Sequence, residues 1–497
     1  MKRLLIITYY WPPTGGSGVQ RWVKFAKYLP SFGWQPVIYT PENPEQLAVD
    51  ESLLADIPAC AEVLKTHISE PYNLYRKVLK VFGSGRQGSA PTGTKKQEEW
   101  PPYGAEPCQA GALKQGEWPP YESQPCQAGT PKKEERLPYE SQPCQTTTEK
   151  QEEVNPINSQ KKGLLKKISL LIRGNCFIPD PRVSWVRPSV RYLSRYLEEH
   201  PVDAVVTTGP PQSMHLIGLG LMKKLGKSGK APRWIADFRD PWTEMFYFKH
   251  LGLLPFARRR HRTLEQRVLD GADTIIAVTP LVQADFQART ATPVELITNG
   301  FDEEDFPDVE VAPFGERFTI VHTGLFADDG NPEALWKVLA ARCAADPEFR
   351  SALRISLAGK VDEGIRVSIE KAGLADNLEL PGYLPHCDTV KLQRSAQVLI
   401  LPLRKEPEYR KVLPGKIFEY LAARRPVLGI GQEDGAAAKV LEDSGAGLML
   451  DWDRTSGMDA FIADVWNSFR KGTPAQSGQN IDKYGRKALT GQLVKIL

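Results

Sequence analysis

The sequence predicts an α/β protein with two Rossmann-like, doubly wound domains that face a cleft. Apolar, β-prone segments alternate with amphipathic helical segments in two parts of the chain, roughly 1–80 and 165–497. Loops rich in Gly, Thr, Pro and Asp follow the strands, and a linker-like segment at 311–317 separates two such series. Ligands of these sheets bind beyond the carboxyl ends of the strands. We therefore expect a site formed by strand-end loops of both domains.

The N-terminal residues predict a βαβ unit. RLLIITYY is apolar and β-prone, PPTGGSG at 12–18 interrupts regular structure, and apolar residues at helical spacing follow until Gly33. QPVIYT is the next strand, parallel to the first. The apolar run from Leu4 to Ile7 is shorter than the about 7–15 residues of a signal-peptide core, so we interpret it as a strand. Cysteines without a CxxC pair also indicate a reducing compartment, and we expect a cytoplasmic protein.

Residues 84–163 differ in composition from the rest of the chain. They are rich in Pro, Gln, Glu, Lys, Gly and Ser, and a repeat places Cys108, Cys126 and Cys144 at intervals of 18 residues. Because aliphatic residues are too few to form a core, we predict a low-complexity, disordered insertion in the first domain. The cysteines are either metal ligands or incidental members of the repeat. The insertion contains no histidine, which favours the second interpretation.

A basic amphipathic stretch at 161–195 follows the insertion. It indicates either contact with an anionic membrane surface or a helix that packs its leucines on the first domain. Strands are then expected at 203–209 and within 233–242, an arginine-rich helix at roughly 256–270, and two further strands in DTIIAVTP and VELITNG. No segment approaches the about 20 apolar residues of a membrane-spanning helix.

The chain after the linker repeats the βα pattern. Strands are predicted in FTIVHTG, RISLAG, LELPGYLP, AQVLILPL, PVLGIG and GLMLDWD, with amphipathic helices between them. We therefore divide the chain into a first domain at 1–310, a second domain at 311–475, and a C-terminal helix at 476–497 that packs back on the first domain. The formal net charge of +4 is too small to indicate a nucleic-acid partner.

Two strand-to-helix loops carry residues suited to a phosphate. The glycines of PPTGGSG allow backbone N–H groups to approach an anion, although a plain tight turn explains them as well. Arg21 either adds charge there or lies on a solvated helix face. In PGKIFEYLAARRPVL, Lys416 is a point charge suited to phosphate, and Glu419 can accept hydrogen bonds from sugar hydroxyls. Taken alone, these two residues would be a weak surface ion pair.

Seven blocks of sequence together resemble a known family. They are PPTGGSGVQR, TTGPPQSMHLIGL, DFRDPW, ITNGFD, VHTG, LAG followed by PGYLPH, and PGKIFEYLAARRPVL, in that order. The pattern is similar to glycosyltransferase family 4, whose members have the GT-B fold, and most similar to the subgroup that makes bacterial surface polysaccharides. The resemblance covers both predicted domains and excludes the insertion.

The resemblance implies roles for individual residues. Lys416 would contact the donor diphosphate, and Glu419 would hold the ribose hydroxyls of the nucleotide. Arg239 and Asp240 occupy the place where the family often has a His-Asp pair beside the acceptor, so with Lys416 they are the catalytic candidates. The other donor-site candidates close over the phosphates, line the cleft or contact the base: Gly15, Gly16, Gly18, Thr323, Gly324, Gly382, Tyr383, Leu384 and Gly415.

The sequence departs from the family pattern in two places. The common pair of glutamates eight residues apart is incomplete, because Lys411 stands eight residues before Glu419, and one loop lacks its basic residues. Many relatives carry an arginine and a lysine soon after the strand that ends in VHTG, whereas this chain has Asp328 and Asp329 there. Arg404, Arg410 or Lys411 replaces the missing cation, or the activity is weak. No DxD run that would hold a metal diphosphate appears where the cleft should be. The aspartate pairs of DFRDPW and LFADDG are interpreted as polar loop residues.

The function implied by the resemblance is retaining, metal-independent, hexosyltransferase-like transfer. The donor would be a UDP- or GDP-sugar, and no cofactor is expected. The acceptor would be a hydroxyl of a saccharide or a lipid-linked molecule, in cell-surface polysaccharide biosynthesis, with peripheral contact at the inner face of the plasma membrane through 161–195. Two alternatives are a weakly active or inactive binding scaffold with the same fold and, with less support, a nucleotide-sugar epimerase.

Overall fold

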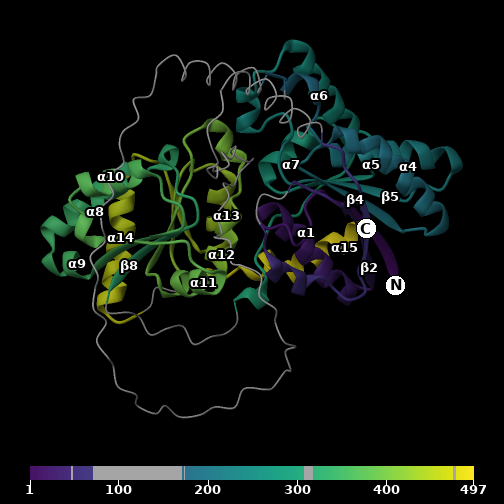
Figure 1. Ribbon diagram of the computed structural model, residues 1–497. Coiled ribbons are helices and arrows are strands. Elements are labelled where there is room, and N and C mark those ends of the chain that lie inside the picture. The colour runs from purple at the N-terminus through teal and green to yellow at the C-terminus, as the bar shows by residue number, and fades with distance from the viewer. Residues whose placement is uncertain (46–48, 71–170, 173, 307–316, 474–476) are drawn as a thin grey trace, which may run out of the picture.

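The computed structural model describes most of the chain outside the predicted insertion and linker. The described residues are 1–45, 49–70, 171–172, 174–306, 317–473 and 477–497. They form two parallel β-sheets with helices on both faces (Figure 1). The predicted fold class is thereby confirmed. The predicted insertion, its three repeated cysteines and the positive charges of 161–170 lie outside the described residues.

The first sheet has seven parallel strands in the order β3-β2-β1-β4-β5-β6-β7. Its strands are β1 (Lys2–Ile7), β2 (Trp34–Pro41), β3 (Glu62–Thr66), β4 (Ala204–Gly209), β5 (Arg233–Phe238), β6 (Thr274–Ala277) and β7 (Val294–Leu296). Its helices are α1 (Ser17–Tyr28), α4 (Val183–Glu199), α5 (Ser213–Leu225), α6 (Pro255–Leu269) and α7 (Pro280–Gln287). The central strand β4 is buried along its whole length because helices cover both faces of the sheet.

The second sheet has six parallel strands in the order β10-β9-β8-β11-β12-β13. The strands are β8 (Phe318–Thr323), β9 (Leu353–Ala358), β10 (Leu378–Gly382), β11 (Val398–Pro402), β12 (Val427–Ile430) and β13 (Gly447–Leu450). The helices are α8 (Glu333–Ala345), α9 (Pro347–Ala352), α10 (Glu363–Lys371), α11 (His386–Ser395), α12 (Lys416–Ala423), α13 (Ala436–Ser444) and α14 (Thr455–Arg470). Pairs such as His322 with Leu357 fix the register of β8 and β9.

Each sheet has a separate apolar core on each face. In the first domain, α4, α5 and α6 cover one face and α1 the other. In the second domain, α8, α10 and α14 lie on one face and α12 and α13 on the opposite face. Trp185 on α4 is buried and stacks on Tyr39, so the described end of the basic stretch 161–195 packs on the sheet.

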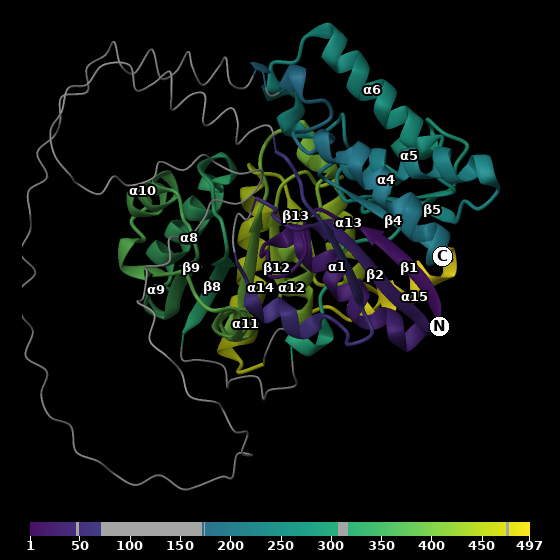
Figure 2. The ribbon, with the colours of Figure 1, turned by 45° about the vertical axis from the view of Figure 1, so that its right-hand side comes forward.

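The last helix, α15 (Arg486–Ile496), belongs spatially to the first domain. Leu489 and Leu493 are buried in the same core as residues of α1, and the two helices lie side by side (Figures 1 and 2). The approach is anchored by a bridge between Phe301 and Gly485, with Phe301 N–H donating to the Tyr484 carbonyl. The C-terminal segment thus ties the end of the second domain to the first. No helix of the described residues is long and apolar enough to cross a membrane.

Candidate active site

The carboxyl ends of β8, β9 and β10 meet at one edge of the second sheet. Two sharp turns follow there, at Gly324 with φ of 96° and at Gly359 with φ of 110°. Gly324 N–H donates to the Ala358 carbonyl at 2.7 Å, and Gly359 N–H donates to the Gly382 carbonyl at 2.7 Å. These two hydrogen bonds join three neighbouring strand ends into one continuous backbone surface. The predicted turn at 382–384 is therefore linked to Thr323–Gly324.

Lys416 is the first residue of α12, and its ammonium group lies over this surface. Nζ donates to the Thr323 carbonyl at 2.9 Å and to His322 Nε2 at 3.1 Å. A Cβ on Gly324 would lie 3.3 Å from Nζ, so the absent side chain leaves the path of the lysine open. Burial lowers the pKa of Lys416 to about 8, an effect that Glu419 partly offsets.

His322 contacts the Lys416 ammonium as a neutral imidazole. Its Nδ1 lies 3.1 Å from the Ile400 carbonyl, and its Nε2 lies 3.2 Å from the Leu325 carbonyl and 3.1 Å from Lys416 Nζ; with the proton on Nδ1, Nε2 accepts from Lys416. Burial and the nearby Lys416 lower the pKa of His322 to about 3. The imidazole therefore stays neutral while the lysine carries the charge.

Glu419, one turn along α12, is connected to the same edge through Gln393. Gln393 Nε2 donates to Thr323 Oγ1 at 3.0 Å and to Glu419 Oε2 at 3.2 Å. Tyr420 OH accepts from Thr323 N–H at 3.1 Å, and burial raises the pKa of Tyr420 to about 12. Within the described residues Lys416 and Glu419 form no ion pair with each other, so the interpretation as a weak surface pair is wrong. Each charged group keeps its own orientation.

We expect Gly359→Ala to disrupt this edge. Its Cβ would lie 2.5 Å from the Gly324 carbonyl oxygen. This is a backbone atom of the turn that Lys416 contacts through Thr323, so relief of the clash would shift that turn. The positive φ adds a strain of roughly 1–2 kcal/mol, and we expect a total destabilisation of about 3 kcal/mol in denaturant unfolding, with weaker nucleotide binding.

Gly373→Ala is the matched control for that substitution. Gly373 also has a positive φ, of 79°, but no atom lies within 4 Å of the added Cβ. It should lose only the roughly 1 kcal/mol of backbone strain and keep full nucleotide affinity. Equal losses in the two variants would show that the contact with Gly324 has no role.

Arg239, in the first domain, ties the predicted glycine loop to the strand ends. Its guanidinium donates to the Gly18 carbonyl at 2.5 Å, to the Gly209 carbonyl at 3.3 Å and to the Pro210 carbonyl. A Cβ on Gly18 would lie 3.1 Å from Nη1 of this arginine. The structure therefore brings Arg239 and Gly18 together. In this arrangement Arg239 positions the loop, while Gly16 is exposed and Gly15 is half-buried.

Asp240 differs from its neighbour Arg239 in its surroundings. Within the described residues its carboxylate forms no hydrogen bond or ion pair, yet it is half-buried at the end of β5. Burial raises the pKa of Asp240, and Arg239 opposes the rise. A carboxylate in this state is suited to accept a hydrogen bond from a substrate hydroxyl.

Arg21 has neither of the two roles considered for it, and both interpretations were wrong. Its side chain is 1% exposed and pairs with the fully buried Asp237 at 3.0 Å. It also donates to the carbonyls of Ile297 and Thr298, at 2.8 and 2.7 Å. Helical spacing alone could not reveal a buried cation whose partner lies far away in the sequence.

The loops of the two domains meet across the facing strand ends. Lys411 of the second domain pairs with both Glu244 and Asp285 of the first, and Lys249 of the first domain pairs with Glu408 at 2.9 Å. Arg410 pairs with Asp434 at 2.9 Å within the second domain. Of the three candidate replacements for the missing cation, Lys411 thus connects the domains and Arg410 points to α13.

Arg404 is the third candidate, and it reaches the loop that lacks a cation. It follows β11, the neighbour of β8, and pairs with Asp329 at 3.0 Å. It also lies over the ring of Tyr409, 5.6 Å from the ring centroid. Arg404 therefore places a positive charge beside the loop that follows Gly324, from a different part of the sequence.

The remaining donor-site candidates lie at the same edge without forming a closed pocket. Tyr383 is 77% exposed and Leu384 is half-buried, and Gly415 is exposed at the start of α12. Sequence reasoning missed His322, Gly359, Gln393 and Tyr420. His322 and Gly359 stand within the quoted blocks VHTG and LAG, but no spacing distinguishes Gln393 on α11. Among the described residues, no group of three His, Cys, Asp or Glu side chains is arranged to hold a metal.

Comparisons with known proteins agree with this architecture. A glycosyl transferase 4-like domain matches residues 175–300, and a glycosyl transferases group 1 domain matches residues 317–466. A search of curated proteins finds no match.

Two solved structures have the same fold at low identity. One is a glycosyltransferase from Rickettsia africae, with 10% identity, a TM-score of 0.55, and coverage of 100% of this chain and 97% of that chain. The other is sucrose-phosphate synthase from Thermosynechococcus elongatus, with 12% identity, a TM-score of 0.51, and coverage of 100% and 98%.

The first match covers β4–β7 of the first sheet, and the second match covers all six strands of the second sheet. Each contains one side of the site: Arg239 and Asp240 lie in the first match, and Thr323, Lys416 and Glu419 in the second. The chain therefore belongs to the GT-B glycosyltransferases that combine a glycosyl transferase 4-like domain with a glycosyl transferases group 1 domain.

Proposed function

We propose that this glycosyltransferase moves a sugar from a nucleoside-diphosphate donor, a UDP- or GDP-sugar, to a hydroxyl group of a saccharide or lipid-linked acceptor. The reaction retains the anomeric configuration, needs no metal, and serves the synthesis of a cell-surface polysaccharide. One observation carries the proposal: the Lys416 ammonium lies at the start of α12, over the backbone surface formed by Thr323–Gly324. A cation and a helix N-terminus at one point form a binding site for a diphosphate.

The transfer step is proposed as follows. The bond between the anomeric carbon and the leaving phosphate oxygen breaks, and a bond to the acceptor oxygen forms on the same face of the sugar. The proton of the acceptor hydroxyl passes to the departing phosphate oxygen. Lys416 and Arg404 stabilise the charge that develops on the diphosphate, which is the main catalytic effect. Asp240 accepts a hydrogen bond from the acceptor, and Glu419 from the ribose.

Arg404 can be tested against its neighbour Arg410. Because Arg404 lies beside the loop after Gly324, we expect Arg404→Ala to lower kcat by roughly tenfold to 100-fold, as for loss of one charged group that acts on the leaving phosphate. Arg410→Ala removes the same charge from an exposed pair with Asp434 and should leave kcat unchanged. Equal effects of the two substitutions on kcat would contradict the assignment.

Donor binding should depend on pH through Lys416. Its pKa is lowered to about 8, so the free protein loses this positive charge as the pH rises from 7 to 9. The dissociation constant for a nucleoside diphosphate should then rise by up to roughly tenfold per pH unit above 8. In Lys416→Arg, the side chain stays charged, and calorimetry over the same range should give a flat profile. A flat profile for the unchanged protein would contradict the role of Lys416.

The donor site itself is tested with a panel of nucleoside diphosphates. We expect calorimetry to show tight binding of one nucleotide to the full chain, and the identity of that nucleotide names the base. Glu419→Ala should weaken nucleotide binding by roughly tenfold, the effect of losing hydrogen bonds to a charged group. Glu442→Ala, on the exposed face of α13, should leave the affinity unchanged. Absence of binding by every nucleotide to a folded protein would refute the donor site. Turnover with a sugar acceptor then separates an enzyme from a binding scaffold.

A further inference from the structure

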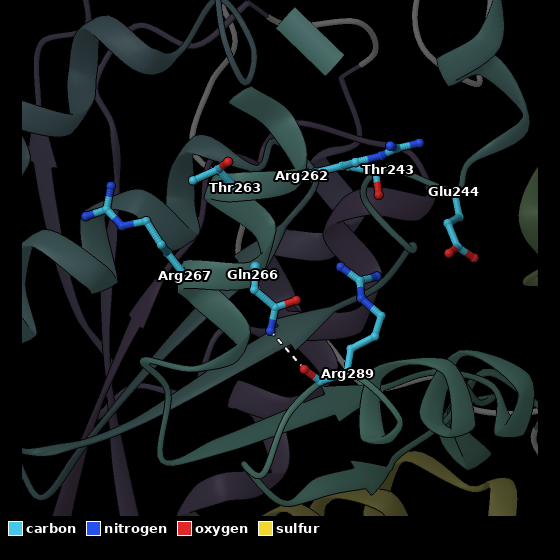
Figure 3. Close-up of a pocket in the computed structure, with 7 residues that line it drawn as sticks. All are labelled: Thr243, Glu244, Arg262, Thr263, Gln266, Arg267 and Arg289. Atoms are coloured by element: carbon cyan, nitrogen blue, oxygen red, sulfur yellow. Dashed lines mark hydrogen bonds between the residues drawn. The ribbon is translucent and has the colours of Figure 1, made fainter. Parts of the chain in front are cut away.

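A hollow of about 620 Å³ lies in the first domain outside the donor site. It is formed by residues of α6, by the loop after β5 and by Arg289, the second residue after the end of α7 (Figure 3). Three of its lining side chains are arginines: Arg262, Arg267 and Arg289. In Figure 3, Arg262 extends towards Thr243, Arg289 rises on the same side of α6, and Arg267 extends in the opposite direction. Arg262 and Arg289 thus line a common space.

Arg289 is held in position by a buried carboxylate. Glu265 is fully buried and accepts from Arg289 Nη2 at 2.6 Å. It also accepts from the backbone N–H and the hydroxyl of Thr243, at 3.1 and 2.8 Å. The arginine side chain remains 28% exposed, and among the described residues its hydrogen bond to Glu265 uses Nη2 alone. Such a fixed arginine loses little entropy when it binds an anion.

The charges around the hollow are not balanced by its acidic residues. Glu265 is paired with Arg289, and Glu244 is paired with Lys411 of the second domain. Arg262 and Arg267 are exposed, and neither forms an ion pair in the part of the chain that the structure describes. The hollow therefore has an excess of positive charge beside a preorganised guanidinium.

We propose that Arg262 and Arg289 bind a phosphate group in this hollow. A phosphate presents oxygens in several directions and can engage two guanidinium groups at once, whereas a carboxylate presents a single edge. Thr243 lines the hollow and lies three residues after Asp240, so the bound phosphate lies against the loop that follows β5. Its source is either a soluble phosphorylated molecule or a lipid headgroup. Exposed Leu254 and Phe256 at the start of α6 are compatible with the second source.

The test compares Arg262→Gln with Arg259→Gln in the full chain. Arg259 is exposed on the same helix and does not line the hollow, so both substitutions remove one charge. In the soluble arm, calorimetry measures binding of inorganic phosphate. In the lipid arm, cosedimentation uses phosphatidylcholine vesicles with and without phosphatidylglycerol. Loss of one charged hydrogen bond should weaken binding roughly tenfold in Arg262→Gln and hardly at all in Arg259→Gln.

The two arms separate the sources. A selective effect of Arg262→Gln on inorganic phosphate supports a soluble phosphate, and a selective effect on vesicles with phosphatidylglycerol supports a headgroup. Equal effects of the two variants in both arms, or no binding in either arm, would overturn the proposal, since only general surface charge would remain. Nucleoside-diphosphate affinity should be unchanged in Arg262→Gln. A parallel loss there would assign these residues to the donor site and reject a separate one.

Discussion

Replacing Lys416 with methionine is expected to lower kcat by roughly 100-fold to 1,000-fold, the range seen when a group aimed at developing charge is removed. The side chain is the first of α12, and its ammonium lies over the Thr323–Gly324 turn. Methionine keeps much of the volume and removes the charge. Binding of the nucleoside diphosphate found in the panel should weaken by a similar factor, and calorimetry together with a transfer assay measures both.

The same substitution should not destabilise the fold, which makes the result specific. The pKa of Lys416 is lowered to about 8 because burial disfavours its charged form. At neutral pH the lysine is charged in both the folded and the unfolded chain, but only in the folded protein is the charge buried and therefore unfavourable, and methionine removes this cost. We expect the free energy of unfolding to stay the same or to rise. A fall in that quantity, together with the loss of activity, would mean that Lys416 has a structural role.

Lys439→Met provides the control for charge. This lysine lies on α13 and pairs with Glu442 and Asp443 on the exposed face of its own helix. It changes the net charge of the protein by the same amount as Lys416→Met. Neither kcat nor nucleotide affinity should respond, because exposed pairs of this kind contribute about 0–1 kcal/mol and lie away from the strand ends.

The second-domain side of the site could be predicted in outline from the sequence. Carboxyl ends of parallel strands share one edge, so Thr323–Gly324 after β8 and Lys416 at the loop before α12 were expected to meet, and they lie 2.9 Å apart from Nζ to the carbonyl oxygen. Gln393 could not be predicted in the same way. It lies on the buried face of α11, where an apolar residue is the ordinary expectation. It does not follow the end of a strand, so the rule that places ligands at strand ends does not identify it.

The missing cation shows a second limit of the sequence. Arg404, Arg410 and Lys411 lie close together in the chain, and spacing does not separate them. In the structure a short 3₁₀ helix at Pro407–Lys411 turns the last two away, Arg410 to Asp434 and Lys411 to the first domain. Only side-chain directions identify Arg404 as the residue beside Asp329.

Asp237→Ala is expected to destabilise the first domain by about 3–5 kcal/mol, the range for breaking a buried ion pair from one side. The aspartate is fully buried and accepts from Arg21, from Trp22 Nε1 at 2.7 Å and from Thr208 Oγ1 at 2.8 Å. Arg21 and these hydrogen bonds hold the pKa of Asp237 below its usual value despite its burial. Removing the carboxylate leaves the Arg21 guanidinium buried without a counter-charge.

Hydrogen exchange of β4 and β5, measured by mass spectrometry, tests the loss of stability around the Arg21–Asp237 pair. A local measurement is needed because the two domains need not unfold together. Exchange there should accelerate strongly in Asp237→Ala, and hardly in Glu433→Ala, which breaks the exposed pair with Arg454. Unchanged protection in Asp237→Ala would refute the role assigned to the pair.

Loss of this ion pair should also affect the candidate site. Arg21 donates to the carbonyls of Ile297 and Thr298 as well as to Asp237, and so joins α1 to the ends of two strands. In the proposed mechanism, Asp240 meets an acceptor only if β5 and the glycine loop keep these positions. We therefore expect a buried pair that touches no substrate to determine where these loops lie.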